Sequence, residues 1–249
     1  GIEVLEIFRV APTGPEFATY SQIEIAAAQL DLWVTPSGER FCDETINFWD
    51  THVGNANARF ATEGYTWNLL DDSIIGRIME EGIRKNISVE FLPGYKPTNI
   101  YGEIQAAIDN GSTEVVAADS LEELAGKMGC DPAVLRATVD EYNAACAKGH
   151  DELFAKDRKY LRPLLGPRFF AIKGRTVFLG TMGGIKINER MEVLDKNDAV
   201  IPGLCAGGFD VGGMYGDSYP IKGSSGLASS FAFSSGRIAG RSILRYLGA

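Results

Sequence analysis

The chain has 249 residues, of which 45% are hydrophobic and 23% are charged, a composition typical of a globular protein with one large or two small cores. Its formal net charge is −9 and its acidic residues are spread along the chain, so the clustered Lys and Arg of nucleic-acid or anionic-membrane binding proteins are missing. No apolar run approaches the roughly 18 residues of a membrane span, and no signal segment opens the sequence. We therefore expect a soluble protein, cytoplasmic or exported, without a nucleic-acid partner.

The cysteines and histidines limit which metal, redox and catalytic sites we expect. The four cysteines are Cys42, Cys130, Cys146 and Cys205. No C-x-x-C pair occurs, which argues against zinc sites and redox motifs and favours structural free thiols. Because His52 and His150 are the only histidines, we do not expect catalysis that depends on several imidazoles. The sequence predicts no metal site.

The first third of the chain predicts a strand, a hairpin and a helix. Residues 2–10, IEVLEIFRV, are β-branched and alternating, as in a strand, and a loop follows. Residues 30–44, LDLWVTPSGERFCDE, predict a hairpin whose turn, Pro36-Ser37-Gly38, has its glycine where a positive φ is favoured. Residues 71–85 carry apolar side chains at helical spacing, which indicates one buried helix face.

The middle of the chain predicts two consecutive helices within residues 120–148. Ser120 and Glu123 form a capping box before the first, and Asp131-Pro132 supplies an N-cap and a first-turn proline for the second, which ends before Gly149. Strands are predicted at residues 168–178 and 183–195, followed by a turn over 196–203. The pattern favours an α+β fold in which a mixed central region is flanked by two terminal segments of another layer.

From Gly203 onward glycine, serine and alanine dominate, up to a predicted helix that begins near residue 227. A loop of small residues that enters a helix places backbone N–H groups and the helix dipole near an anion, typically a phosphate. This pattern occurs in GLCAGGFDVGG and again in KGSSGLASSF. Taken alone it is a weak signal, because glycine-rich turns also serve to pack a helix on a sheet.

Four segments in order resemble one flavoprotein superfamily, that of fumarate reductases, succinate dehydrogenases and 3-ketosteroid dehydrogenases. TMGGIKINERMEVLDKNDAVIPGLCAGGFDVGG, followed by GRIAG, is similar to the C-terminal part of that family. LWVTPSGERFCDE resembles its L-V-N-x-x-G-x-R-F-x-N-E hairpin, and SLEELAGKMGCDPAVLRATVDEYN resembles its helical cap domain. The resemblance covers most of the chain.

The resemblance implies an FAD enzyme that acts on a carbon–carbon bond next to a carbonyl. It implies a cap domain at residues 35–185 between two segments of a flavin-binding α/β domain, residues 1–34 and 186–249. The G-x-G-x-x-G segment that cradles the flavin pyrophosphate is missing from the 249 residues, so we expect the chain to be the C-terminal portion of a longer polypeptide. The predicted cofactor-binding residues are Ala206, Gly207, Gly208, Ser224, Ser225 and Gly226.

The cationic residues that hold dicarboxylates in this family are replaced here by apolar or aromatic residues. The family's histidine before Pro-Thr is Ala11, and its proton-donating arginine, four residues after the hairpin glutamate Glu44, is Phe48. Its histidine pair is Leu179-Gly180. Leaving two carboxylates without partners costs several kcal/mol, so we expect no fumarate reduction and a larger, less charged substrate such as a ring ketone or enone. Phe48, Leu179 and Gly180 are the predicted substrate-pocket residues.

The segment GDSYPIKG is similar to the T-Y-P-G-x-G of ketosteroid dehydrogenases. The resemblance implies that the Tyr219 hydroxyl and the Gly223 N–H polarise a ketone oxygen as an oxyanion hole. Counted backwards from GRIAG, the loop is about three residues longer than expected, and that register places Lys222 where the tyrosine belongs. The alternatives are a turn without catalytic function, a true fumarate reductase, and a non-catalytic cap that acts as a binding module. The substrate, the electron partner and whether this chain alone binds FAD stay open.

Overall fold

The computed structural model describes residues 4–10, 21–48, 50–60, 63–86, 91–215, 219 and 226–248. The chain divides into two compact units, one formed by Phe8–Val177 and the other by Gly1–Ile7 with Phe178–Ala249. We call them the larger and the smaller unit and describe each by itself. Helices and sheets are mixed, as the predicted α+β class requires. The predicted boundaries after residues 34 and 185 stay a prediction.

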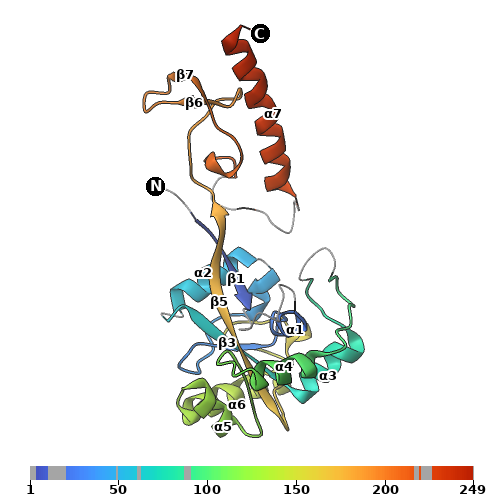
Figure 1. Ribbon diagram of the computed structural model, residues 1–249. Helices are drawn as coiled ribbons and strands as arrows, with labels where there is room; N and C mark the ends of the chain where they lie inside the picture. Colours follow the sequence, from blue (N-terminus) through green and yellow to red (C-terminus); the bar gives the residue numbers. More distant parts are fainter. Residues whose placement is uncertain are drawn as a thin grey trace. The chain divides into compact units, whose positions relative to one another are not determined.

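One five-stranded sheet provides the frame of the larger unit, and residues 4–7 of its strand β1 and 178–181 of its strand β5 belong to the smaller unit (Figure 1). Its strands are β1 (Val4–Val10), β2 (Leu32–Val34), β3 (Tyr65–Asp71), β4 (Val115–Ala118) and β5 (Phe169–Thr181). The order is β1-β5-β3-β2, and β4 also pairs with β5. β5 pairs antiparallel with β3, where Leu70 faces Phe170, and antiparallel with β4. Antiparallel pairing of short strands to one long strand places residues from distant parts of the chain side by side.

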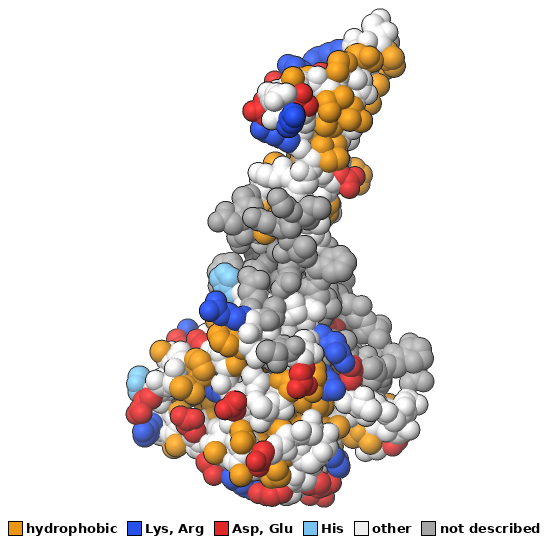
Figure 2. Space-filling view, turned by 90° about the vertical axis from the view of Figure 1, so that its left-hand side faces the viewer, with side chains coloured by type: hydrophobic (Ala, Val, Ile, Leu, Met, Phe, Trp, Pro, Cys, Tyr) orange, Lys and Arg blue, Asp and Glu red, His pale blue; other side chains and the backbone are white. Residues whose placement is uncertain are grey.

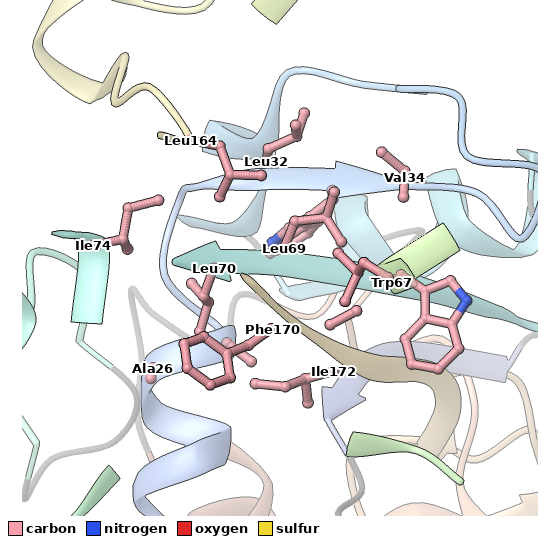
Figure 3. Packing of buried hydrophobic residues seen from close by; sticks show 14 of the residues in the cluster. Ala26, Leu32, Val34, Trp67, Leu69, Leu70, Ile74, Leu164, Phe170 and Ile172 are labelled. Carbon is pink, nitrogen blue, oxygen red and sulfur yellow. The ribbon is translucent and has the colours of Figure 1, made fainter. Parts of the chain in front are cut away.

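Six helices and two 3-10 turns complete the described part of the larger unit. They are α1 (Gln22–Ala27), η1 (Glu44–Phe48), α2 (Asp50–Phe60), α3 (Asp72–Glu81), α4 (Ile100–Asp109), α5 (Leu121–Met128), α6 (Pro132–Lys148) and η2 (Arg158–Tyr160). α1, α2 and α3 contact β3, whose side chains are almost continuously buried. Figure 3 shows Leu70, Phe170 and Ala26 together in this core. Because the strand is covered on both faces, even its polar residues Thr66 and Asn68 are buried.

The local signals read from the sequence are confirmed at several elements. The hairpin turn forms, with Gly38 at φ +91° and a hydrogen bond from Gly38 N to Thr35 O. Ser120 caps α5 by accepting a hydrogen bond from Glu123 N, and Gly149 ends α6 in the left-handed conformation. The helix predicted over 71–85 is too long, because α3 ends at Glu81. Gly82 takes φ +93°, and a Cβ there would lie 2.6 Å from the Gly94 backbone.

The smaller unit contains β6 (Glu192–Leu194), β7 (Val200–Cys205), the turn η3 (Gly208–Asp210) and the 21-residue helix α7 (Leu227–Leu247). α7 lies alongside β7 and η3 (Figure 1). The single strand predicted over 183–195 is wrong. The chain turns back at Met191, whose φ is +64°, and Ile187 bridges to Val193 in antiparallel fashion. The segment is a tight hairpin because Asn188 Oδ1 accepts hydrogen bonds from Arg190 N and Glu192 N.

The smaller unit buries few apolar side chains. Its described buried hydrophobic residues are Met191, Val193, Val211 and Tyr219. By contrast, Phe233, Tyr246 and Leu247 of α7 are 83%, 61% and 68% exposed. Hydrophobic side chains are visible on the surface of this unit in Figure 2. Among the described helices, none has both the length and the apolar character needed to cross a membrane.

Candidate functional site

Tyr219 is buried in the smaller unit with its hydroxyl at the start of α7. Only 8% of the residue is exposed, and its Oη accepts a hydrogen bond of 2.9 Å from the backbone N–H of Ala228. Ala228 is in the first turn of α7, where backbone N–H groups have no intrahelical partner. The positive end of the helix dipole therefore faces the phenol oxygen.

Aromatic rings hold Tyr219 in this position. The ring of Tyr215 meets it edge to face at a centroid distance of 4.8 Å, and the ring of Phe209 lies at 6.4 Å. Tyr215 also contacts Phe231 of α7 at 6.5 Å. Sequence reasoning missed Phe209 and Tyr215. In the sequence, the one feature that could have identified them is that both lie in the glycine-rich stretch 203–226, where an aromatic side chain has few other large neighbours.

Gly180 joins the same cluster. A Cβ at Gly180 would lie 3.3 Å from Cε1 of Phe209, and the Thr181 hydroxyl donates to Phe209 O at 3.1 Å. Phe209 thus packs directly on the backbone of Gly180. The structure brings together Gly180 and Tyr219, two residues that the sequence assigned to the site separately, with Phe209 between them.

The predicted cofactor loop at Ala206, Gly207 and Gly208 connects β7 to η3 and is fastened to α7. Ser235 Oγ accepts a hydrogen bond from Gly208 N at 3.0 Å and lies at hydrogen-bond distance from Ala232 O. A Cβ at Gly207 would lie 2.8 Å from the Ser235 Oγ. The small residues here therefore have a packing function, and their contact with a cofactor stays a prediction.

Gly226 is the N-cap of α7, with φ +83° and no side-chain hydrogen bond to the helix. A Cβ built on it would meet nothing within 4 Å. Backbone N–H groups at this helix start can hydrogen-bond an electronegative atom of a ligand. The other residues predicted for this loop, Lys222, Gly223, Ser224 and Ser225, lie outside the described residues, as do Ala11 and the side chain of Leu179.

Phe48 ends η1 in the larger unit and packs on Tyr160, with ring centroids 5.6 Å apart. The residue is half-buried. Its assignment to a substrate pocket stays a prediction, beside the alternative that it belongs to the core of the cap.

A buried ion network positions η1. Arg40 binds Glu44 through two 2.8 Å hydrogen bonds, Nε to Oε1 and Nη2 to Oε2, and its Nη1 lies 2.8 Å from Asp151 Oδ2. Lys156 Nζ lies 3.0 Å from Glu44 Oε2 and donates to the Tyr142 hydroxyl. Arg40 and Glu44 are the arginine and glutamate of the hairpin motif. Their buried ion pair gives these two motif residues a structural function. Because each charge is paired, the network holds the hairpin, η1 and α6 together without an unpartnered buried ion.

Comparisons with known proteins identify the family of this chain. Residues 11–225 match the model of a family described as FAD binding domain. The chain is 32% identical, over 237 residues, to a vinyl phenol reductase of Lactiplantibacillus plantarum, which covers 94% of this chain and 47% of that protein. It is 33% identical over 144 residues to an NADH:fumarate oxidoreductase of Klebsiella pneumoniae, covering 55% of this chain and 16% of that protein.

The fold is also similar to that of a solved dehydrogenase. The structure of a 3-ketosteroid delta1-dehydrogenase from Sterolibacterium denitrificans superposes with a TM-score of 0.67 and 22% identity, covering 96% of this chain and 43% of that chain. The chain thus spans less than half the length of each of these three proteins. It belongs to the FAD binding domain family, a family of FAD-dependent oxidoreductases that includes relatives of fumarate reductases and ketosteroid dehydrogenases.

Proposed function

We propose that the protein to which this chain belongs uses FAD to add or remove hydrogen at a carbon–carbon bond next to a carbonyl, on an uncharged, ring-bearing substrate. The observation that carries this proposal is the Tyr219 hydroxyl, held at the start of α7 by Ala228 N. A buried phenol beside a helix N-terminus is suited to hydrogen-bond an oxygen that gains negative charge during the reaction.

The proposed roles follow from the hydrogen bonding of each group. When bound, FAD exchanges a hydride with one carbon of the substrate. Because the Tyr219 oxygen already accepts from Ala228 N, its proton is available for the substrate carbonyl. Backbone groups of Gly207, Gly208 and Gly226 would hold the flavin, since the helix start offers N–H donors and Gly226 adds no side chain in the way. Lys222 stays the rival of Tyr219 for the electrophilic role.

The substrate class is inferred from the residues around Tyr219. The described neighbours Phe209 and Tyr215 are aromatic, and Gly180 adds no charge. A dicarboxylate without cationic partners would pay several kcal/mol of desolvation, whereas an aromatic or alicyclic ring gains from contact with these side chains. The name of the vinyl phenol reductase relative points to a substrate with a ring and without a carboxylate, which supports the uncharged, ring-bearing part of the proposal. The carbonyl is inferred from Tyr219 alone.

The test begins with the cofactor. We would add excess FAD to the purified chain, pass it through gel filtration and record the visible spectrum, then repeat this with the product of the complete gene. Retained flavin in either protein permits a substrate panel in which reoxidation of the reduced flavin is measured with cyclohex-2-enone, 4-vinylphenol and fumarate. We expect turnover with at least one uncharged substrate and not with fumarate.

Rapid reoxidation by fumarate alone would refute the proposed substrate class and support a fumarate reductase. A complete gene product that never retains flavin would refute the catalytic proposal and support a binding module.

A further inference from the structure

The contact between Gly180 and Phe209 explains why residue 180 has no side chain. For a Cβ built on Gly180, the three nearest atoms all belong to the Phe209 ring, at 3.3, 3.4 and 3.5 Å. Gly180 does not take the positive φ that favours glycine, so the backbone at this position of β5 permits a side chain. The obstacle is the aromatic ring. A side chain larger than a methyl group at residue 180 would have to displace Phe209.

The backbone of Phe209 is held on both sides of the residue. Its carbonyl oxygen accepts a hydrogen bond of 3.1 Å from the hydroxyl of Thr181, the last residue of β5. The N–H of the preceding Gly208 donates to Ser235 Oγ of α7 at 3.0 Å. Because a fixed backbone limits the rotamers that a side chain can adopt, these two bonds restrict the directions open to the ring.

Phe209 is also a neighbour of Tyr219, the residue on which the proposed chemistry depends. The two ring centroids are 6.4 Å apart and the rings are inclined by 56°. Phe209 is 39% exposed, whereas Tyr219 is 8% exposed. The Phe209 ring therefore offers apolar surface to a ligand whose oxygen is bound by the Tyr219 hydroxyl. Apolar surface beside a few placed polar groups is the usual composition of a small-molecule site.

We propose that Phe209 limits the size of the ring that the substrate site accepts, and that Gly180 is required because it makes room for Phe209. This inference rests on the proposed function, since it takes the Tyr219 hydroxyl as the point that holds the substrate oxygen. The substrate class is then an uncharged ketone or enone with one six-membered ring, which packs on Phe209 and carries no bulky substituent on that side.

The contact is tested first, by a double-mutant cycle on the purified chain. Gly180→Val suits a strand but places a branched side chain against the ring, so we expect it to lower the thermal unfolding midpoint by about 2–10 °C. In the Phe209→Ala background the ring is gone, and the same substitution should have little effect or raise the midpoint. Equal effects of Gly180→Val in the two backgrounds would overturn the proposed coupling.

The size limit is tested with the complete, flavin-loaded protein. We would measure kcat/KM for cyclohex-2-enone and for the bulkier 4-phenylcyclohex-2-enone in the wild type and in Phe209→Ala. Loss of the ring should lower kcat/KM for the smaller substrate and raise it for the larger one. We expect their ratio to change by about tenfold or more, the usual effect of a change of shape in an apolar pocket.

Two further variants separate the size of the side chain from its mere presence. Phe209→Leu keeps an apolar contact with less volume, so its substrate ratio should fall between those of the wild type and Phe209→Ala. Phe233→Ala is the matched control, because it removes an aromatic side chain of α7 that is 83% exposed and has no role in the proposed site. It should leave the substrate ratio unchanged.

The outcomes distinguish this inference from the proposed function. Turnover of cyclohex-2-enone with the same substrate ratio in the wild type and in Phe209→Ala would overturn the size limit and leave the role of Tyr219 intact. An equal change of the ratio in Phe233→Ala and Phe209→Ala would overturn it as well, since the effect would not be specific to the site. A flavin-loaded wild type that turns over no uncharged substrate would refute the proposed function, and this inference with it.

Discussion

The backbone N–H of Ala228 donates a 2.9 Å hydrogen bond to the hydroxyl of Tyr219. The two residues are nine positions apart in the sequence, and the contact joins the glycine-rich loop to the first turn of α7. It determines which lone pair of the phenol is occupied and therefore where its proton can point. A single backbone contact thus orients the group on which the proposed chemistry depends.

Replacing Tyr219 by Phe removes the hydroxyl and keeps most of the ring packing on Tyr215 and Phe209. In the complete, flavin-loaded protein we expect kcat with the best uncharged substrate to fall by about 10²–10³-fold, the effect of losing one oxyanion-hole donor. The visible flavin spectrum should be unchanged. Lys222→Met is the matched variant for the rival register, and a large loss in that variant with normal turnover in Tyr219→Phe would transfer the role to Lys222.

Arg40→Gln should strongly destabilise the larger unit. The substitution leaves Glu44 and Asp151 as buried carboxylates that have lost a partner, and breaking a buried ion pair in this way costs about 3–5 kcal/mol. Urea unfolding followed by the fluorescence of the buried Trp33 and Trp67 measures the change. Arg136→Gln, at an exposed ion pair, should leave the midpoint unchanged. Equal midpoints for the two variants would show that the network does not stabilise the fold.

Gly212→Ala should destabilise the smaller unit because two backbone segments meet there. A Cβ at Gly212 would lie 2.2 Å from Gly184 N, and Gly212 N donates to Ile185 O. The backbone must move to admit the methyl group, at a cost of about 1–3 kcal/mol. Gly236→Ala, in α7 with nothing within 4 Å of the new Cβ, should instead stabilise by about 0.5–1 kcal/mol. Circular dichroism of thermal unfolding distinguishes these outcomes. A Gly212→Ala variant that is more stable than the wild type, or a Gly236→Ala variant that is less stable, would contradict the packing described here.

Asp31 should make stability decrease as pH rises. Burial raises the pKa of Asp31 in the folded state, and the positive charges of Arg162 and Lys156 only partly oppose this. The folded state therefore holds the proton more tightly than the unfolded state, whose Asp pKa is about 3.9. The resulting stabilisation is complete below that value and is lost as pH rises through the raised folded pKa.

Asp31→Asn carries no charge at any pH, so we expect it to gain stability relative to the wild type as the pH rises above about 4. Urea midpoints at several pH values measure this gain. A stability difference that stays constant with pH would mean that Asp31 titrates normally.

Amide protection should differ between the two units. β3 is buried along its length, whereas α7 exposes Phe233, Tyr246 and Leu247 and buries mainly Ser235 and Ser242. Segments that bury little apolar surface open locally at low free energy. Hydrogen exchange of the purified chain should therefore be faster in α7 than in β3. Protection of α7 equal to that of β3 would contradict the expected difference.

The elements with local signals were predictable from the sequence. α5 and α6 are marked by Ser120, Asp131-Pro132 and Gly149, each of which acts within a few residues of the helix end. α2 and β3 were missed for different reasons. The sequence of α2, DTHVGNANARF, has few apolar side chains to show a helical period, whereas β3, YTWNLLD, buries the polar Thr66 and Asn68 together with its apolar residues, so burial there does not follow polarity. Asn68 even lies inside β3, where its amide donates to Ile172 O.

The sequence by itself determined the family and the FAD cofactor, and it predicts the replacement of the cationic dicarboxylate ligands, because these depend on which residues stand at motif positions. Only the tertiary structure decided that Ala228 N meets the Tyr219 hydroxyl and that Phe209 lies against Gly180. These contacts depend on the path of the backbone between the residues. Hydrogen-bond geometry and burial arise from that path, and no short pattern of side chains specifies them.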